Sequence, residues 1–274
     1  MNKSPISWTD YTWNPSHGCS KVEPPDGDSG CTNCYAARIS QQYDHTDQPW
    51  TAEHAEENVS IHPEKLDEPY ALDEPAFVFV NSMSDLFHSV VPDAFIEDVF
   101  AVMRNCPHLI FQILTKRPGR AAHIPLDWPP NVWMGTSVED ERVVERLDLL
   151  RDCEAETLFV SFEPLIGPVG EVDLSGYDWA IIGGESGPDD DRRDMDHAWA
   201  RAIYRACHVQ DVAFYFKQSS ARTSEQGTAL TVYNAEHDIY EQRRIREVPA
   251  PVKAVQRARR ARQDEAVAAD GGEP

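Results

Sequence analysis

Short apolar segments alternate with longer amphipathic stretches along most of the chain. Six segments form near-continuous runs of aliphatic, β-branched and aromatic residues, which is typical of strands covered on both faces. They are residues 77–80, 109–114, 132–135, 158–160, 179–182 and 212–216. Helical periodicity marks three intervening stretches, 92–104, 140–151 and 196–208. This alternation predicts repeated βα units built on a parallel sheet.

The number of these units favours a barrel-like arrangement over an open sheet. We expect an α/β fold, a partial (β/α) barrel of about six to seven parallel strands with a C-terminal extension. The barrel would occupy residues 1–219 and contain a cysteine loop at 18–35. Residues 220–274 would form the extension, partly helical or disordered, with a short hairpin around 230–240 and a surface helix over 252–268. Residues 44–75 read as a surface excursion.

Composition and charge indicate the kind of environment in which the protein works. The 274 residues carry 47 acidic and 25 basic side chains, a net charge of −22. So acidic a surface suits concentrated salt, which predicts a halophilic host or its virus, and it argues against wrapping nucleic acid over a broad face. No apolar run approaches the roughly 20 residues that span a bilayer, so we expect a cytoplasmic protein with no membrane segment.

Three of the six cysteines cluster in one glycine-punctuated loop. Cys19 follows Gly18, and Cys31 and Cys34 form a C-x-x-C pair at the start of an expected helix. Three thiolates can hold three irons of a cubane cluster and leave the fourth iron open, whereas a structural zinc site closes its shell with four ligands. From spacing alone, the alternatives are a cluster, a zinc site completed by His17, or a redox dithiol with a spectator cysteine. The remaining cysteines, Cys106, Cys153 and Cys207, are expected to be buried free thiols.

Polar or glycine-rich residues follow each expected strand. Ligands gather at the carboxyl ends of parallel strands, so six such ends indicate one shared pocket, although a solvated turn is the plain alternative at each of them. The candidate contacts for substrate or cofactor are Lys116, Arg117, Glu163 and Lys217. Lys116, Arg117 and Lys217 would suit a carboxylate or phosphate. Gly183 and Gly184 would let a ligand approach main-chain amides, with Glu185 available for an amine or hydroxyl, unless the pair is only a tight turn.

These motifs together resemble a known family. The chain is similar to an uncharacterised phage-protein family with a three-cysteine motif, whose members are regarded as divergent relatives of radical S-adenosylmethionine enzymes. The similarity covers roughly residues 6 to 219. It is carried, in the same order, by Ile6 to Pro15, Gly18-Cys19, Gly30 to Ala36, Ser84 to His88, Leu114 to Pro118, Asn131 to Glu139, Glu163 to Leu165, Gly183 to Gly187 and Phe216 to Gln218.

The resemblance implies a partial α/β barrel and a definite chemistry. Cys19, Cys31 and Cys34 would hold a [4Fe-4S] cluster whose open iron chelates S-adenosylmethionine, and the turn from Ser82 to Asp85, with Gly183, Gly184 and Glu185, would line the cofactor pocket. An electron from the cluster would cleave the cofactor to a 5′-deoxyadenosyl radical that abstracts hydrogen from a substrate. Eleven residues separate Cys19 from Cys31, more than in the usual radical enzyme, but a longer loop costs only modest closure entropy.

The partners of this chemistry are less defined by the sequence. The family context suggests a nucleotide or nucleic-acid substrate, and the reaction needs a reducing electron donor; a partner protein is a further candidate. The alternative from another class is a zinc-stabilised binding protein without turnover, in which His17 joins the three cysteines.

Overall fold

An eight-stranded sheet forms the centre of the protein in the computed structural model, which describes residues 1–24, 27–43, 45–46, 48–234 and 236–249. Its strands follow the order β1-β2-β5-β6-β7-β8-β9-β10, and only the β1–β2 pair is antiparallel. Their bounds are β1 Asn2–Lys3, β2 Tyr11–Trp13, β5 Ala76–Val80, β6 Leu109–Thr115, β7 Val132–Ser137, β8 Thr157–Phe162, β9 Trp179–Gly183 and β10 Ala213–Gln218. Within these described residues the sheet is not closed by hydrogen bonds. The six predicted strands are therefore confirmed, β2 adds a seventh parallel strand, and the fold is α/β.

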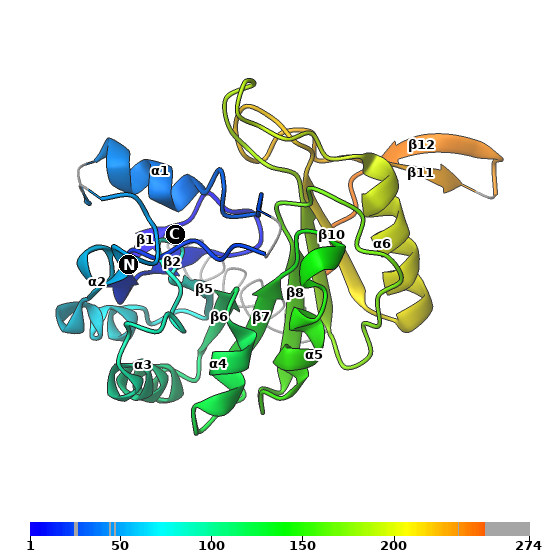
Figure 1. Ribbon diagram of the computed structural model, residues 1–274. Helices are drawn as coiled ribbons and strands as arrows, with labels where there is room; N and C mark the ends of the chain where they lie inside the picture. Colours follow the sequence, from blue (N-terminus) through cyan, green and yellow to red (C-terminus); the bar gives the residue numbers. More distant parts are fainter. Residues whose placement is uncertain (25–26, 44, 47, 235, 250–274) are drawn as a thin grey trace, which may run out of the picture.

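Helices connect most of the parallel strands, as the amphipathic stretches predicted. They are α3 Asp93–Asn105, α4 Pro118–His123, α5 Arg146–Arg151 and α6 His197–Gln210 (Figure 1). Pro118 occupies the first turn of α4, where its missing N–H costs nothing. The Asp196 side chain caps α6 by accepting from the Ala198 amide at 2.7 Å.

The helix expected over 140–151 is broken into two pieces. A 3₁₀ turn, Glu141–Val143, precedes α5. The Asp140 carboxylate accepts from the Arg142 amide at 3.0 Å and from the Arg142 guanidinium, which fixes a tight local turn in place of the first helical turn. The prediction of one continuous helix was wrong for this reason.

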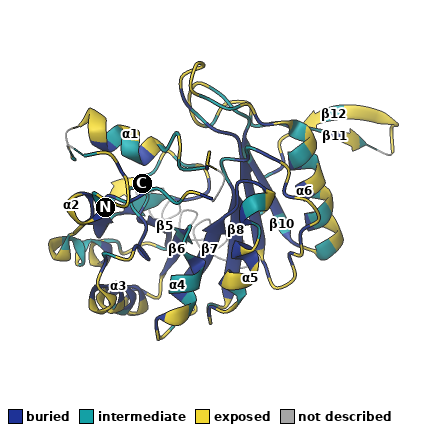
Figure 2. Ribbon diagram, viewed as in Figure 1, coloured by how far each residue is buried: buried dark blue, intermediate teal, exposed yellow. Residues whose placement is uncertain are grey.

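The two faces of the sheet are covered by different layers. The helices pack on one face, where Val78, Phe100, Ile113 and Leu147 belong to one large buried cluster. A separate cluster of mostly aromatic side chains covers the other face: Trp8, Phe77, Phe79, Ile110, Trp133, Phe159, Trp179, Ile181 and Tyr215. Figure 2 shows the strands as the most deeply buried part of the molecule. Because neighbouring residues of a strand point to opposite faces, both layers are built by the same apolar runs.

Trp8 holds the aromatic layer together. It precedes β2 in the chain, and its ring centroid lies 4.8 Å from Phe79 on β5, 6.4 Å from Phe159 on β8 and 6.3 Å from Trp179 on β9. Near it, the hydroxyls of Ser7 and Tyr215 on β10 are 2.8 Å apart. One short segment therefore contacts strands from both ends of the sheet.

Smaller elements lie around the sheet. Helix α1 is Tyr35–Gln42, and β3 (Ser16–His17) pairs with β4 (Ser60–Ile61). Between α1 and β5, the excursion predicted at 44–75 also holds α2 (Ala55–Asn58) and the 3₁₀ turns η1 (Pro63–Lys65) and η2 (Glu68–Ala71).

The described part of the C-terminal extension packs against the edge of the sheet. The predicted hairpin is present as β11 (Leu230–Asn234) and β12 (Ile239–Arg243). Beyond it, the Phe216 amide of β10 donates to Ile245 O at 2.8 Å. The helix predicted over 252–268 lies outside the described residues. None of the helices within the described ranges combines the length and apolar character that crossing a bilayer requires.

Candidate functional site at the carboxyl ends of the strands

The first cysteine is fixed by a glycine that no other residue can replace without strain. Gly18 has a left-handed φ of +82°, and a Cβ built on it would lie 1.7 Å from the carbonyl oxygen of Asn58. Its amide donates to Met83 O at 3.1 Å, in the turn that follows β5. These backbone contacts place Cys19 beside the carboxyl end of β5.

Arg117, at the end of β6, supports the Cys19 segment from the other side. Its Nη1 lies 3.6 Å from the Cys19 Sγ and 3.2 Å from Asp85, and its Nη2 donates to Ser20 O at 3.0 Å. The Ser20 hydroxyl lies 2.8 Å from His88 Nε2. Arg117, predicted to contact substrate or cofactor, thus contacts the protein's own cysteine segment.

Asp85 is buried and its oxygens are already engaged. They accept from the Thr115 hydroxyl at 2.7 Å, the Lys116 amide at 3.1 Å and the Phe87 amide at 3.0 Å, besides Arg117. This aspartate joins the ends of β5 and β6. Its contacts position the residues around it, and its predicted place in the cofactor pocket stays a prediction.

Ser82 is engaged in the same turn. Its hydroxyl donates to Asn14 Oδ1 at 3.2 Å, and its carbonyl accepts from the Tyr35 hydroxyl at 2.5 Å. Tyr35 is the first residue of α1, so the turn after β5 anchors the helix that follows the C-x-x-C pair.

Cys31 and Cys34 lie at the start of α1, as the spacing predicted. Cys34 is the N-cap residue of the helix, and its amide donates to Cys31 O at 3.3 Å. The residue before the pair, Gly30, faces β7: a Cβ there would lie 2.3 Å from Glu139 Cγ. The C-x-x-C segment therefore rests directly on the carboxyl end of β7.

The three thiols lie within electrostatic range of one another. Burial, followed by Asp85, Cys31 and Cys34, raises the pKa of the Cys19 thiol to about 12, while Arg117 opposes this rise. Burial also raises the pKa of Cys34, and Cys31 adds to this effect. The two halves of the motif therefore lie at the same end of the sheet. A metal centre would have to displace protons from these thiols, because thiolates are the ligands.

A buried ion-pair group lies beside Cys31 and Cys34. Glu139 forms an ion pair with Lys116, whose Nζ lies 2.6 Å from one carboxylate oxygen, and accepts from Arg146 Nη1 at 2.8 Å through the other. The side chains of Glu139 and Arg146 are 4% and 7% exposed. Burial alone would lower the pKa of Lys116, but Glu139 and Cys31 outweigh it and raise that pKa. The lysine is therefore charged at neutral pH and lies within electrostatic range of the thiols.

A second group of ion pairs and hydrogen bonds, formed by Glu185 and Arg193, holds the cysteine loop to the segment after β9. Glu185 accepts from the Arg193 guanidinium and from Asn33 Nδ2, at 3.1 Å, inside the C-x-x-C motif. Arg193 also donates to Asp28 at 2.9 Å and to Ser29 O at 3.0 Å. The pKa of Glu185 is lowered because these donors outweigh the cost of burial. The acid predicted to bind an amine or hydroxyl of a ligand here binds Arg193.

Two further predicted residues, Glu163 and Lys217, form an ion pair with each other across β8 and β10. The space that Gly183 leaves is taken by Glu163, since a Cβ there would lie 2.7 Å from Glu163 Oε1. The space at Gly184 is taken by Ser220, whose amide nitrogen would be 2.3 Å away. In this state the glycine pair accommodates protein atoms, and its role toward a cofactor stays a prediction.

The histidine considered as a fourth ligand has a partner of its own. His17 Nδ1 lies 3.1 Å from His62 Nε2, and its ring stacks on His45. Among the described residues, no three His, Cys, Asp or Glu side chains are grouped so that they could hold a metal ion. Cys106, Cys153 and Cys207 are buried and free, as predicted.

One comparison with known proteins gives a match. The model of the family described as "Protein of unknown function (DUF5131)" matches residues 3–267. The chain belongs to this family. No curated protein and no solved structure matches it.

Sequence reasoning missed several residues that shape the site of this DUF5131 protein. Arg146 and Arg193 lie outside the strand ends, on a helix and in a loop, and both bind a strand-end acid. Asn33 occupies one of the two variable positions of C-x-x-C, so the motif gave no reason to single it out. Glu139 lies in the polar segment that follows the run at 132–135, but it was not among the predicted contacts.

Proposed function

We propose that this DUF5131 protein is a radical S-adenosylmethionine-type iron–sulfur enzyme, with Cys19, Cys31 and Cys34 as ligands of a [4Fe-4S] cluster. The observation that supports the proposal is the placement of the Cys19 and C-x-x-C segments beside the carboxyl ends of neighbouring parallel strands, where α/β folds bind ligands. The family model itself describes no function, so the relation to phage proteins and to radical enzymes is part of the proposal.

The donor set fits such a cluster. Three thiolate ligands would leave one iron open, and a cubane holds its ligands further apart than a single ion does. Lys116 and Arg117 lie beside the thiols and would offset the negative charge of the thiolates. Together the cluster and S-adenosylmethionine would supply a one-electron cleavage that begins hydrogen abstraction.

The remaining predicted residues take supporting roles in this proposal. Asp85 and Arg117 hold Cys19, while Glu185 holds the C-x-x-C segment through Asn33. Glu163 and Lys217 lie on the strands next to β9, where Gly183 and Gly184 would border the cofactor. For these glycines to meet it, the contacts of Glu163 and Ser220 must loosen when the cofactor binds.

We extend the proposal to the shape of the sheet. Trp8 contacts β5, β8 and β9 on the face opposite the helices, and Ser7 contacts β10. A side-chain layer that joins strands from both ends of a sheet supports a partial barrel with a filled interior. The reaction would then take place at the mouth of the barrel, above the aromatic layer.

The setting of the reaction follows from the same reasoning. We place the protein in the cytoplasm of a halophilic host or its virus, because its net charge of −22 suits concentrated salt. A nucleotide or nucleic acid would be the substrate, a reducing protein or small molecule would donate the electron, and a partner protein would complete the system.

Metal content decides the proposal. Protein purified without oxygen should be brown and contain about four irons and four sulfides per chain. Cys34→Ala should lose the cluster, whereas Cys153→Ala, which removes a buried thiol distant from the motif in sequence, should keep it. With a strong reductant, wild type and Cys153→Ala should form 5′-deoxyadenosine from S-adenosylmethionine. A colourless protein with one zinc per chain would establish the zinc-stabilised binding protein instead.

A further inference from the structure

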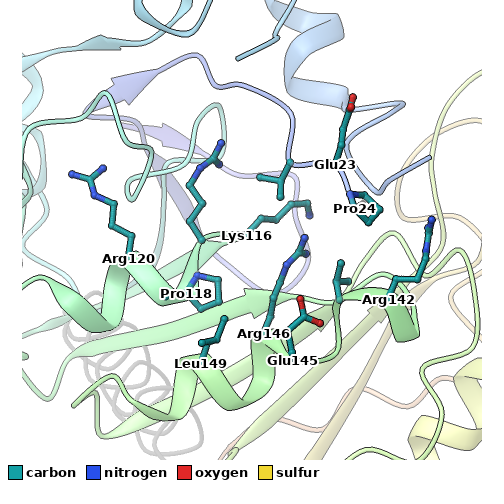
Figure 3. A pocket seen from close by; sticks show the side chains of 13 residues that line it. Glu23, Pro24, Lys116, Pro118, Arg120, Arg142, Glu145, Arg146 and Leu149 are labelled. Carbon is teal, nitrogen blue, oxygen red and sulfur yellow. The ribbon is translucent and has the colours of Figure 1, made fainter. Parts of the chain in front are cut away.

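A cavity of about 370 Å³ opens beside the cysteine loop. It lies between residues 22–24 of that loop and the segments that follow β6 and β7 (Figure 3). Five of its lining residues are cations and only two are acids, in a chain whose acids outnumber its bases 47 to 25. This local reversal of charge indicates an anionic occupant.

The cations of this cavity differ in how much of their hydrogen-bonding capacity the protein uses. Arg120 is committed to the start of α3, where it contacts Val91 O and Asp93. Arg117 is committed to Asp85 and to the Cys19 segment. These two contribute positive charge and fix the wall of the cavity.

Lys116 and Arg146 retain unused donors. Both bind the same carboxylate, Glu139, so two largely buried cations share one negative charge. Arg146 donates only through its Nη1, to Glu139 and to Ser137 O, each at 2.8 Å. Its Nε and Nη2 form no hydrogen bond within the described residues, and the Lys116 ammonium has three N–H groups for one ion pair. Figure 3 shows the two charged ends close together, facing the segment of Glu23 and Pro24.

Five further lining residues are apolar. Val22, Pro24, Pro118, Val143 and Leu149 line the cavity, and Leu149 is 39% exposed there although it is a large aliphatic residue. Pro24, Pro118 and Val143 are already buried by the protein, so Val22 and Leu149 are the apolar side chains that a ligand could cover. They fit the organic part of a ligand whose charged end lies on Lys116 and Arg146.

We infer that this cavity binds a small organic phosphate of about mononucleotide size, with its phosphate between Lys116 and Arg146. The arginine fork and the lysine point charge are the side chains that suit phosphate oxygens. Lys116 and Arg146 together carry one positive charge more than Glu139 neutralises, and that charge would balance the phosphate. A concave site on an otherwise acidic surface selects a small molecule over a polymer, whose further phosphates would meet acidic side chains.

The inference narrows the substrate class in the proposed function, yet the binding itself does not require the cluster. Lys116 and Arg117 line the cavity and also lie beside the thiols, whereas Arg146 and Leu149 lie on α5. Binding of the phosphate and loading of iron are therefore separable measurements.

Isothermal titration of the full-length protein tests the inference. The probes are AMP, CMP, GMP and UMP, the matching nucleosides, and inorganic phosphate, all at one salt concentration. We expect at least one monophosphate to bind more than about 10-fold more tightly than its nucleoside, because charge-assisted hydrogen bonds to the phosphate carry the affinity. Inorganic phosphate should compete with it.

Matched variants connect that binding to the cavity. Leu149→Glu places a negative charge at an exposed position of the wall and should weaken the monophosphate about 5-fold relative to Leu149→Gln. Arg146→Gln should weaken it about 10-fold or more, while Arg151→Gln, on the same helix but outside the cavity, should leave it unchanged. The Leu149 pair keeps the test decisive if Arg146→Gln does not fold.

Three results would overturn the inference. They are nucleosides binding as tightly as their monophosphates, Leu149→Glu behaving like Leu149→Gln, and no binding of any monophosphate or of inorganic phosphate. Binding of a short single-stranded oligonucleotide without binding of the monophosphates would replace the small ligand with nucleic acid. Cys34→Ala should retain monophosphate binding while losing iron, so failure of the cluster proposal and failure of this one give different results.

Discussion

Replacing Glu139 by glutamine should destabilise the protein more than any neutralisation of an exposed acid. The substitution keeps the size of the side chain, and therefore its contact with Gly30, but removes the charge shared by Lys116 and Arg146. Both cations then lose the carboxylate with which they form ion pairs. The variant therefore isolates the electrostatic part of the interaction.

The expected loss follows from the burial of the three side chains. Removing one partner of a buried ion pair costs about 3–5 kcal/mol, because it leaves the other charge uncompensated. Lys116 is 20% exposed, so water recovers part of the loss. We expect about 3 kcal/mol in the free energy of unfolding, a large share of the roughly 5–15 kcal/mol that holds a domain together.

Urea denaturation monitored by circular dichroism measures this difference. Glu145→Gln, which neutralises an exposed acid on the wall of the same cavity, is the control and should change the free energy of unfolding by less than about 0.5 kcal/mol. Adding Lys116→Met to Glu139→Gln should restore part of the loss, since it removes one uncompensated charge. The reasoning is refuted if Glu139→Gln is no less stable than Glu145→Gln, or if the double variant is no better than the sum of the single losses.

Three other predictions follow from contacts and charge. Arg193→Gln should speed amide hydrogen exchange at residues 28–33, because it removes the ion pairs with Glu185 and Asp28, whereas Arg192→Gln, whose partners Asp189 and Asp194 are exposed, should not. Burial and then the charge of Arg117 lower the pKa of His88 from 6.5 to about 4. The unfolded chain therefore binds more protons in this window, and the stability due to neutral His88 should be complete at pH 7 and fall by up to about 3 kcal/mol as the pH drops to 4. Finally, the melting temperature should rise as KCl is raised from about 0.1 to about 2 M, because salt screens the repulsion of 22 excess negative charges.

Each of these has its own contradicting result. Equal exchange rates at 28–33 in the two arginine variants would show that Arg193 does not hold this segment. If His88→Asn loses as much stability between pH 6.5 and 4 as the wild type does, His88 is not the group responsible. A melting temperature that is flat or falls with KCl would end the argument for a halophilic host.

The strands could be predicted because their signal is local. Each of β5 to β10 is a run of apolar residues long enough to stand out, and all six were found. The strand β2 is only Tyr11–Trp13, and its one fully buried side chain, Trp13, gives no period to detect. The break before α5 depends on one side chain, Asp140, whose competition with the helix becomes visible only in three dimensions.

The site was predictable in position but not in its internal contacts. Parallel topology alone brings the residues after β5, β6, β7 and β9 to one edge, so Asp85, Lys116, Arg117 and Glu185 were found as polar residues in the right places. Which of them binds which partner depends on residues distant in the sequence. Arg193, for example, lies 165 positions from Asp28 along the chain and contacts it in space.

The aromatic layer around Trp8 has a consequence for traffic into and out of the protein. In the proposed barrel these packed rings would fill the interior, so the reactants of the proposed enzyme would enter and leave on the side of the cysteine loop. A second reactant would then have to pass the first one bound, and the product would have to leave by the same opening. Turnover would then follow a compulsory order, with the last arrival leaving first.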